Sequence, residues 1–278
     1  MKKLIFTVIL LLAASLSHAF DIRALESKLS DYLAPYGGKV GVAFIDCQTM
    51  EQFSVNGDLP YPAASVIKMP IMTTLFFMSD RSLVDINERV VLKNSDKLEG
   101  SGVLRWLKAG NSYTLWGLAR MMISISDNTA TRLLVRKIGQ DNINDFCKLM
   151  GLNNTRLNDE TALVEPPANC NRTSPNDMAS LIYKIKYGNA FSPKAVEDML
   201  AFMKNQRYRW GIVKPLPPGT IVANKTGNLT GVLNDVGMVY TDRGNYILAI
   251  MTWKFQQKSE ARKVINRISE MAYNFYVN

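Results

Sequence analysis

Ser65 and Lys68 form the only Ser-x-x-Lys sequence in the 278-residue chain. A helical pattern follows Ser65, and residues i and i+3 of a helix lie on one face, so we expect the lysine amine beside the serine hydroxyl. A hydroxyl needs a base to attack a carbonyl at neutral pH, and a lysine can serve if burial or positive neighbours lower its pKa. The pattern therefore predicts a serine nucleophile for acyl transfer. The structural alternative is a helix-capping serine followed by a solvated lysine.

The only histidine, His18, lies in an amino-terminal segment typical of a secretory signal peptide. This segment consists of two lysines, an apolar run over 4–14 and the sequence Ser17-His18-Ala19. The run is shorter than the about 20 residues of a membrane-spanning helix. We expect cleavage after Ala19, a periplasmic or secreted chain over 20–278, and no stable membrane insertion. That chain has no histidine, which excludes a Ser-His-Asp triad, a Cys-His pair and a histidine-ligated metal.

Two further polar motifs each occur once. Ser126-Asp127-Asn128 separates two helical patterns: it could simply cap the second helix, or Ser126 could relay a proton while Asn128 binds a substrate amide and Asp127 fixes the loop. Lys225-Thr226-Gly227 ends a β-type run. It could be an ordinary strand end, or a cation and a hydroxyl that bind a carboxylate, with a glycine that lets an edge strand approach a ligand closely. Asn228 then offers a backbone N–H to an oxyanion.

The charge and the cysteines indicate neither nucleic acid nor a disulfide framework. The whole chain carries +9, and loss of Lys2 and Lys3 with the signal leaves 31 basic against 24 acidic residues, a charge of +7. These charges are scattered along the chain, so we expect no nucleic-acid partner. The three cysteines, Cys47, Cys147 and Cys170, form no C-x-x-C pair, and their odd number leaves at least one thiol unpaired.

The apolar patterns place strands at both ends of the mature chain and helices between them. The ends carry predicted helices over 22–33 and 260–276 and predicted strands over 39–45, 52–55, 221–225, 232–241 and 246–255. Between them lie helical signals over 66–78, 115–123, 129–138, 143–150 and 175–186. Hairpin spacing favours an antiparallel sheet. We expect an α+β protein with two lobes: an α/β lobe over 20–62 and 212–278, and an inserted helical lobe over 63–211.

In this order, the three motifs resemble those of the penicillin-recognising serine enzymes, and specifically of class A β-lactamases. The resemblance covers nearly all of the mature chain. It implies a five-stranded antiparallel sheet with flanking terminal helices. It also implies that a β-lactam substrate acylates Ser65, and that no metal or organic cofactor takes part. The implied catalytic residues are Ser65, Lys68 and Ser126, and the implied substrate-binding residues are Asn128, Lys225, Thr226, Gly227 and Asn228. We expect a monomer.

A class A β-lactamase also needs a glutamate that activates water against the acyl-enzyme. In the family this glutamate lies in a loop after the second motif, usually as Glu-Pro-x-x-Asn. Glu165-Pro166-Pro167-Ala168-Asn169 reproduces that motif. Glu160 lies nearer the expected distance from Arg156 but has Val164 where the asparagine should be. We favour Glu165 and keep Glu160 as the competing candidate.

Two rival functions remain open on the sequence. A penicillin-binding D,D-peptidase would share the acylation of Ser65 but release the acyl group slowly. A catalytically silent envelope-binding module would keep the fold without the chemistry. The glutamate separates the first rival from a β-lactamase, and reaction with a β-lactam separates the second.

Overall fold

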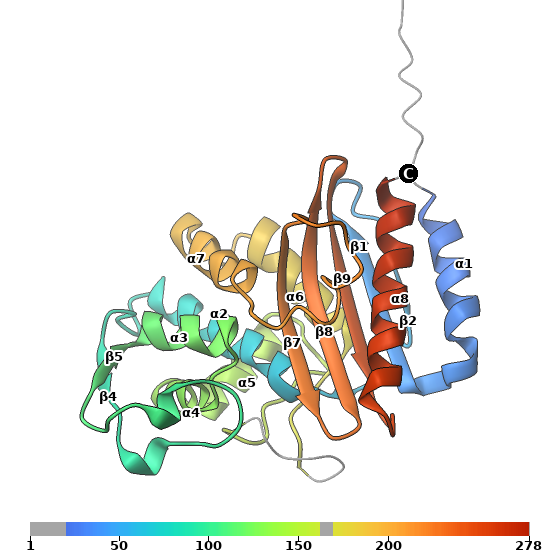
Figure 1. Cartoon of the computed structure of the whole chain (residues 1–278). Helices are drawn as coiled ribbons and strands as arrows, with labels where there is room; N and C mark the ends of the chain where they lie inside the picture. Colours follow the sequence, from blue (N-terminus) through green and yellow to red (C-terminus); the bar gives the residue numbers. More distant parts are fainter. Residues whose placement is uncertain (1–20, 162–168, 278) are drawn as a thin grey trace, which may run out of the picture.

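A five-stranded antiparallel sheet forms the middle of the molecule, with strand order β2-β1-β9-β8-β7 (Figure 1). The computed structural model describes residues 21–161 and 169–277. The strands are β1 (Val40–Asp46), β2 (Gln52–Val55), β7 (Val222–Leu229), β8 (Val232–Thr241) and β9 (Gly244–Thr252). The predicted α+β class and the antiparallel sheet are therefore confirmed, and β7, which carries Lys225-Thr226-Gly227, is an edge strand.

The terminal helices α1 (Ile22–Leu33) and α8 (Lys258–Val277) pack together on one face of the sheet (Figure 1). Asp21 caps α1 by accepting hydrogen bonds from the backbone N–H groups of residues 23 and 24. The buried residues of α1 recur at helical spacing and face a core that includes Phe44 of β1 and Tyr246 of β9. Burial of this apolar stripe holds both ends of the chain against the sheet.

The inserted segment supplies helices to the opposite side of the sheet (Figure 1). They are α2 (Lys68–Ser79), α3 (Leu115–Ser124), α4 (Asn128–Ile138), α5 (Gln140–Leu149), α6 (Pro175–Tyr187) and α7 (Pro193–Lys204). Two short strand pairs, β3 (Tyr61–Pro62) with β6 (Arg172–Thr173) and β4 (Arg89–Val91) with β5 (Ser112–Thr114), complete this part. Helix α6 packs directly against β1, β8 and β9. The division of the chain into an α/β lobe and a helical lobe remains a prediction.

Several element boundaries differ from the sequence predictions. Strand β7 continues to Leu229, so Lys225-Thr226-Gly227 lies within the strand rather than at its end. The helix predicted from Val66 is a 3-10 turn over Ala64–Ile67 followed by α2 from Lys68, so Pro70 lies in the first turn of α2. A proline there forfeits no hydrogen bond within α2, because the N–H groups of the first turn have no acceptor inside the helix. Helix α5 begins at Gln140 rather than Ile143, and α7 had no separate prediction. Ser192 caps α7 and Pro193 opens it, a start signal that could have been read from the sequence.

Within the described ranges, no helix is long and apolar enough to cross a membrane. The same residues contain no group of three or more histidine, cysteine or acidic side chains placed to hold a metal ion. Cys47, Cys147 and Cys170 are all buried and unpaired. Burial raises the pKa of the Cys47 and Cys147 thiols to about 12, which makes these two thiols poor nucleophiles.

Candidate active site

Ser65 lies in the 3-10 turn that leads into α2 and is partly exposed, whereas its neighbours in the turn are buried. The turn is anchored from two sides. The backbone N–H of Ala63 donates to the carbonyl of Asn171 at 2.7 Å, and the Asn234 side chain on β8 donates to the carbonyls of Pro62 and Ala63 at 2.9 and 3.2 Å. Sheet and loop together therefore fix the position of the Ser65 hydroxyl.

Lys68 places its amine against Ser65, as its spacing predicted. The Nζ atom lies 3.0 Å from Ser65 Oγ and, across the site, 3.1 Å from Ser126 Oγ, 2.9 Å from the Ser126 carbonyl and 2.7 Å from Asn128 Oδ1. Burial, reinforced by the positive charge of Lys225, lowers the pKa of Lys68 well below its ordinary value, against a smaller opposing effect of Asp127. A lowered pKa lets the neutral amine accept the proton of the Ser65 hydroxyl.

Asp127 is the N-cap residue of α4 and also holds the loop in front of that helix. Its carboxylate accepts hydrogen bonds from the backbone N–H of Ala130 at 2.9 Å, of Val103 at 2.6 Å and of Leu104 at 2.9 Å. The preceding Ser126 has a φ of 57°, a left-handed conformation that is uncommon for serine. The capping and loop-fixing interpretations of this motif therefore both apply to Asp127.

Asn128 is buried, with both side-chain polar atoms engaged. Its Oδ1 accepts from Lys68, and its Nδ2 donates to the carbonyl of Glu99 at 2.9 Å. These bonds place Asn128 beside the lysine, and its predicted contact with a substrate amide stays a prediction.

Lys225 is a second fully buried lysine. Its Nζ lies 3.1 Å from Ser126 Oγ and 2.8 Å from the Thr226 carbonyl, so the Ser126 hydroxyl bridges the amines of Lys68 and Lys225. Thr226 is buried next to it, whereas Asn228 is exposed.

Gly227 brings the edge strand close to the nucleophile turn. A Cβ atom there would lie 3.0 Å from the Ala63 carbonyl oxygen and 3.1 Å from the Ala64 Cβ. Sequence reasoning assigned the glycine to close approach of a ligand, and the structure adds that β7 also approaches the Ser65 turn itself.

Asp235 is a buried acid to which sequence analysis assigned no role. It lies on β8 directly opposite Thr226 of β7 and accepts hydrogen bonds from Asn224 Nδ2 at 2.9 Å and the Ile212 N–H at 2.8 Å. Burial lowers the pKa of Lys225 to about 7, and the negative charge of Asp235 opposes that fall. Burial likewise raises the pKa of Asp235, against its hydrogen bonds and the charge of Lys225.

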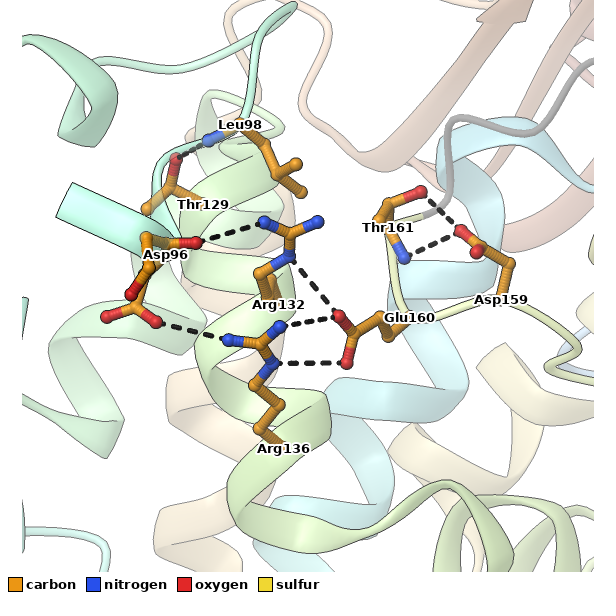
Figure 2. A network of polar contacts seen from close by, with 9 residues as sticks. Asp96, Leu98, Thr129, Arg132, Arg136, Asp159, Glu160 and Thr161 are labelled. Carbon is orange, nitrogen blue, oxygen red and sulfur yellow. Dashed lines mark hydrogen bonds and ion pairs between the residues drawn. The ribbon is translucent and has the colours of Figure 1, made fainter. Parts of the chain in front are cut away.

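Glu160, the competing candidate base, binds arginines of α4 (Figure 2). Its carboxylate lies 2.9 Å from Arg136 Nη2 and 3.3 Å from Arg132 Nε, and Arg136 also pairs with Asp96 at 3.2 Å. Neither Ser65 nor Lys68 is among these partners. Glu165 lies outside the described residues.

Sequence and structure comparisons relate this chain to known proteins. Residues 24–276 match the family described as the beta-lactamase enzyme family. Beta-lactamase CARB-3 of Pseudomonas aeruginosa is 26% identical over 216 residues, which cover 74% of this chain and 71% of the relative.

Solved structures match over nearly the whole chain. A beta-lactamase from Sphaerobacter thermophilus is 32% identical with a TM-score of 0.83, covering 92% of this chain and 97% of that one. A mutant of PBP-A, solved as an acyl-enzyme complex with penicillin G, is 28% identical with a TM-score of 0.85, again covering 92% and 97%.

Replacement of Asp127 by alanine should lower the free energy of unfolding by about 3 kcal/mol, because it removes a helix cap and leaves two further backbone N–H groups without their acceptor. Thr114→Ala is the matched control, since Thr114 caps α3 through one bond to the Gly117 N–H, and should cost about 1 kcal/mol. Urea unfolding measures both. Equal losses would show that the bonds to Val103 and Leu104 contribute nothing to stability.

Proposed function

The chain belongs to the beta-lactamase enzyme family, and we propose that it is a serine β-lactamase that hydrolyses the lactam amide through an acyl-enzyme on Ser65. The observation that carries this proposal is the pair of buried lysines around one hydroxyl. Lys68, its pKa lowered by burial, lies 3.0 Å from Ser65 Oγ, and Ser126 Oγ links it to Lys225. The arrangement supplies a base, a nucleophile and a proton route without histidine.

Acylation begins with transfer of the Ser65 hydroxyl proton to Lys68, or through a water to Glu165. The Ser65 oxygen then attacks the lactam carbonyl, and the N–H groups of Ser65 and Asn228 stabilise the oxyanion. The proton passes from Lys68 through Ser126 to the lactam nitrogen as the C–N bond breaks. Lys225 and Thr226 bind the substrate carboxylate, and Gly227 allows the strand to approach the substrate closely. Asn128 binds an amide of the substrate.

Deacylation requires a base that draws a proton from water as the water attacks the Ser65 ester. We assign this role to Glu165. The pairing of Glu160 with Arg132 and Arg136 supports that choice, because its carboxylate oxygens are engaged by the two guanidinium groups rather than directed at Ser65 or Lys68. The products are the ring-opened acid and free Ser65.

The second candidate is a penicillin-binding D,D-peptidase that acylates as above but deacylates slowly. The likeness to PBP-A favours it, because a mutant of that protein was captured as an acyl-enzyme complex with penicillin G. The two candidates share every acylating residue and differ in the lifetime of the ester.

We also propose that the enzyme acts in the periplasm or outside the cell, after cleavage behind Ala19, and that it acts as a monomer. Ser65, Lys68, Ser126 and Lys225 all come from one chain and already contact one another, which supports a site complete without a partner chain.

Incubation with a chromogenic cephalosporin tests the function. We expect sustained turnover by the mature chain and a loss of roughly 10³-fold or more in Ser65→Ala, which lacks the nucleophile. A single burst that ends in a stable adduct on Ser65 would replace the β-lactamase by the penicillin-binding candidate. Absence of any adduct would favour the silent envelope-binding module.

The two glutamates are separated by matched variants read by acyl-enzyme lifetime in mass spectrometry. Glu165→Gln should lengthen the lifetime by roughly 100-fold or more, because it removes the base for water. Glu160→Gln, the control, should leave the lifetime within a few-fold and cost at most about 1 kcal/mol of stability, as expected for a partly exposed ion pair. The reverse result would identify Glu160 as the base. If neither variant traps the adduct, neither glutamate is the deacylating base, and the β-lactamase assignment is weakened.

The pH dependence of kcat/KM tests the electrostatic effect of Asp235 on Lys225. Lys225 binds a carboxylate only while protonated, so kcat/KM should fall as the pH rises through its pKa of about 7. Asp235→Asn removes a negative charge that favours the protonated lysine. The basic limb should therefore move to lower pH by about one unit. Asp242→Asn, at an exposed turn between β8 and β9, should leave the limb in place. A basic limb that stays in place in Asp235→Asn, or moves to higher pH, would show that Asp235 does not favour the protonated form of Lys225.

A further inference from the structure

A pocket of about 520 Å³ lies beside the segment that leads into Ser65 and is not used by the proposed reaction. It opens between the start of β1, the β3–β6 pair and the end of β9. Its rings and charges come from Tyr36, Lys39, Tyr61, Arg172, Trp253 and Lys254. We call these six residues the cationic pocket.

The charged side chains that line the cationic pocket are all positive. They are Lys39, Arg172 and Lys254, and no carboxylate is among the lining residues. None of the three forms an ion pair within 21–161 and 169–277. Like charges gathered in a recess with apolar walls concentrate a positive potential there, and an anion entering the recess would relieve their repulsion.

Trp253 lies among these charges. Lys254 Nζ lies 4.7 Å from the centre of a Trp253 ring and the Arg172 guanidinium lies 6.0 Å from it. Lys254 has a φ of 64°, so the chain turns in a left-handed conformation where its side chain meets the ring. A half-buried indole flanked by cations suits a ligand that joins a flat or ring-shaped group to a negative charge.

The backbone under the cationic pocket is firmly held. The N–H of Trp253 donates to the Lys39 carbonyl at 2.9 Å, the Tyr61 hydroxyl donates to the Gly38 carbonyl at 3.0 Å, and Arg172 pairs with Pro62 across β3 and β6. Side-chain substitutions at Arg172 and Lys254 leave these backbone bonds intact. The pocket is therefore already formed without a ligand, which lowers the entropic cost of binding one.

We propose that the cationic pocket is a binding site for a ring-bearing carboxylate, with the Arg172 guanidinium on the carboxylate and the ring stacked on Trp253. Arginine binds carboxylates through two parallel hydrogen bonds, and Lys254 and Lys39 add charge. Both an acidic saccharide and an aromatic acid have this chemistry. Trp253 also packs against the cluster of Ala64, Leu229 and Val232, so an occupant would lie one layer of side chains from Ser65.

Titration of the mature chain with two probes tests the site: 2-naphthoate, and a disaccharide that ends in glucuronate. The neutral 2-naphthamide and the methyl ester of the disaccharide are the matched ligands. We expect saturable 1:1 binding of at least one acid, a shift of the Trp253 indole N–H signal in NMR spectra, and no binding of its neutral counterpart. The acid that binds identifies the source of the ligand. Weaker binding at higher salt is also expected.

Arg172→Gln and Lys254→Gln should each weaken binding, by roughly tenfold for Arg172→Gln. Lys28→Gln on the exposed side of α1 is the control and should bind as the unchanged protein does. Thermal unfolding verifies that each variant is folded. If Arg172→Gln does not fold, Lys254→Gln, at an exposed position, still tests the site. Ser65→Ala should bind each probe as the unchanged protein does, which keeps this site separate from the proposed catalysis. If neither acid binds saturably, or if Arg172→Gln and Lys254→Gln both bind as tightly as Lys28→Gln, the proposal is wrong.

Discussion

The candidate site depends on keeping two lysines buried within reach of one serine hydroxyl. Lys68 and Lys225 are both fully buried, and Ser126 Oγ lies 3.1 Å from each amine. Two ammonium groups so close would repel each other and lose their hydration, so burial favours the neutral form of at least one of them. The same desolvation that costs stability makes Lys68 a base. Lys225 can retain its positive charge, because the negative charge of Asp235 opposes the fall in its pKa.

Holding that arrangement requires elements from three distant parts of the sequence. Helix α2 brings Lys68, the start of α4 brings Ser126, and edge strand β7 brings Lys225. Two of these parts are fixed by bonds outside the site: the Asn234 side chain donates to the carbonyls of Pro62 and Ala63, and Asp127 accepts from the N–H groups of Val103 and Leu104. The strain of Ser126 at a positive φ is tolerated because the residues on both sides of it are anchored.

The sequence predicted the parts of this site that depend on local spacing. The i, i+3 relation of Ser65 and Lys68, the capping role of Asp127 and the strand under Lys225 follow from short-range geometry and were found in place. Asp235 was missed because its role comes from pairing across β7 and β8, and an apolar-rich strand pattern does not show which partner its one acid faces. The cationic pocket was missed for the same reason, since its charges, Lys39, Arg172 and Lys254, come from three distant parts of the sequence.

Glu160 shows why motif distance alone could not choose the deacylating base. Its spacing from Arg156 made it a candidate, yet its carboxylate is taken up by two arginines one helical turn apart on α4, the helix whose first residue is Asn128. A carboxylate in that position ties the loop to the helix that carries part of the site, and its negative charge is already neutralised. A carboxylate that activates water needs an oxygen free to accept the proton. The engagement of Glu160 with two arginines, rather than a count of residues, therefore supports the proposal that Glu165 is the base.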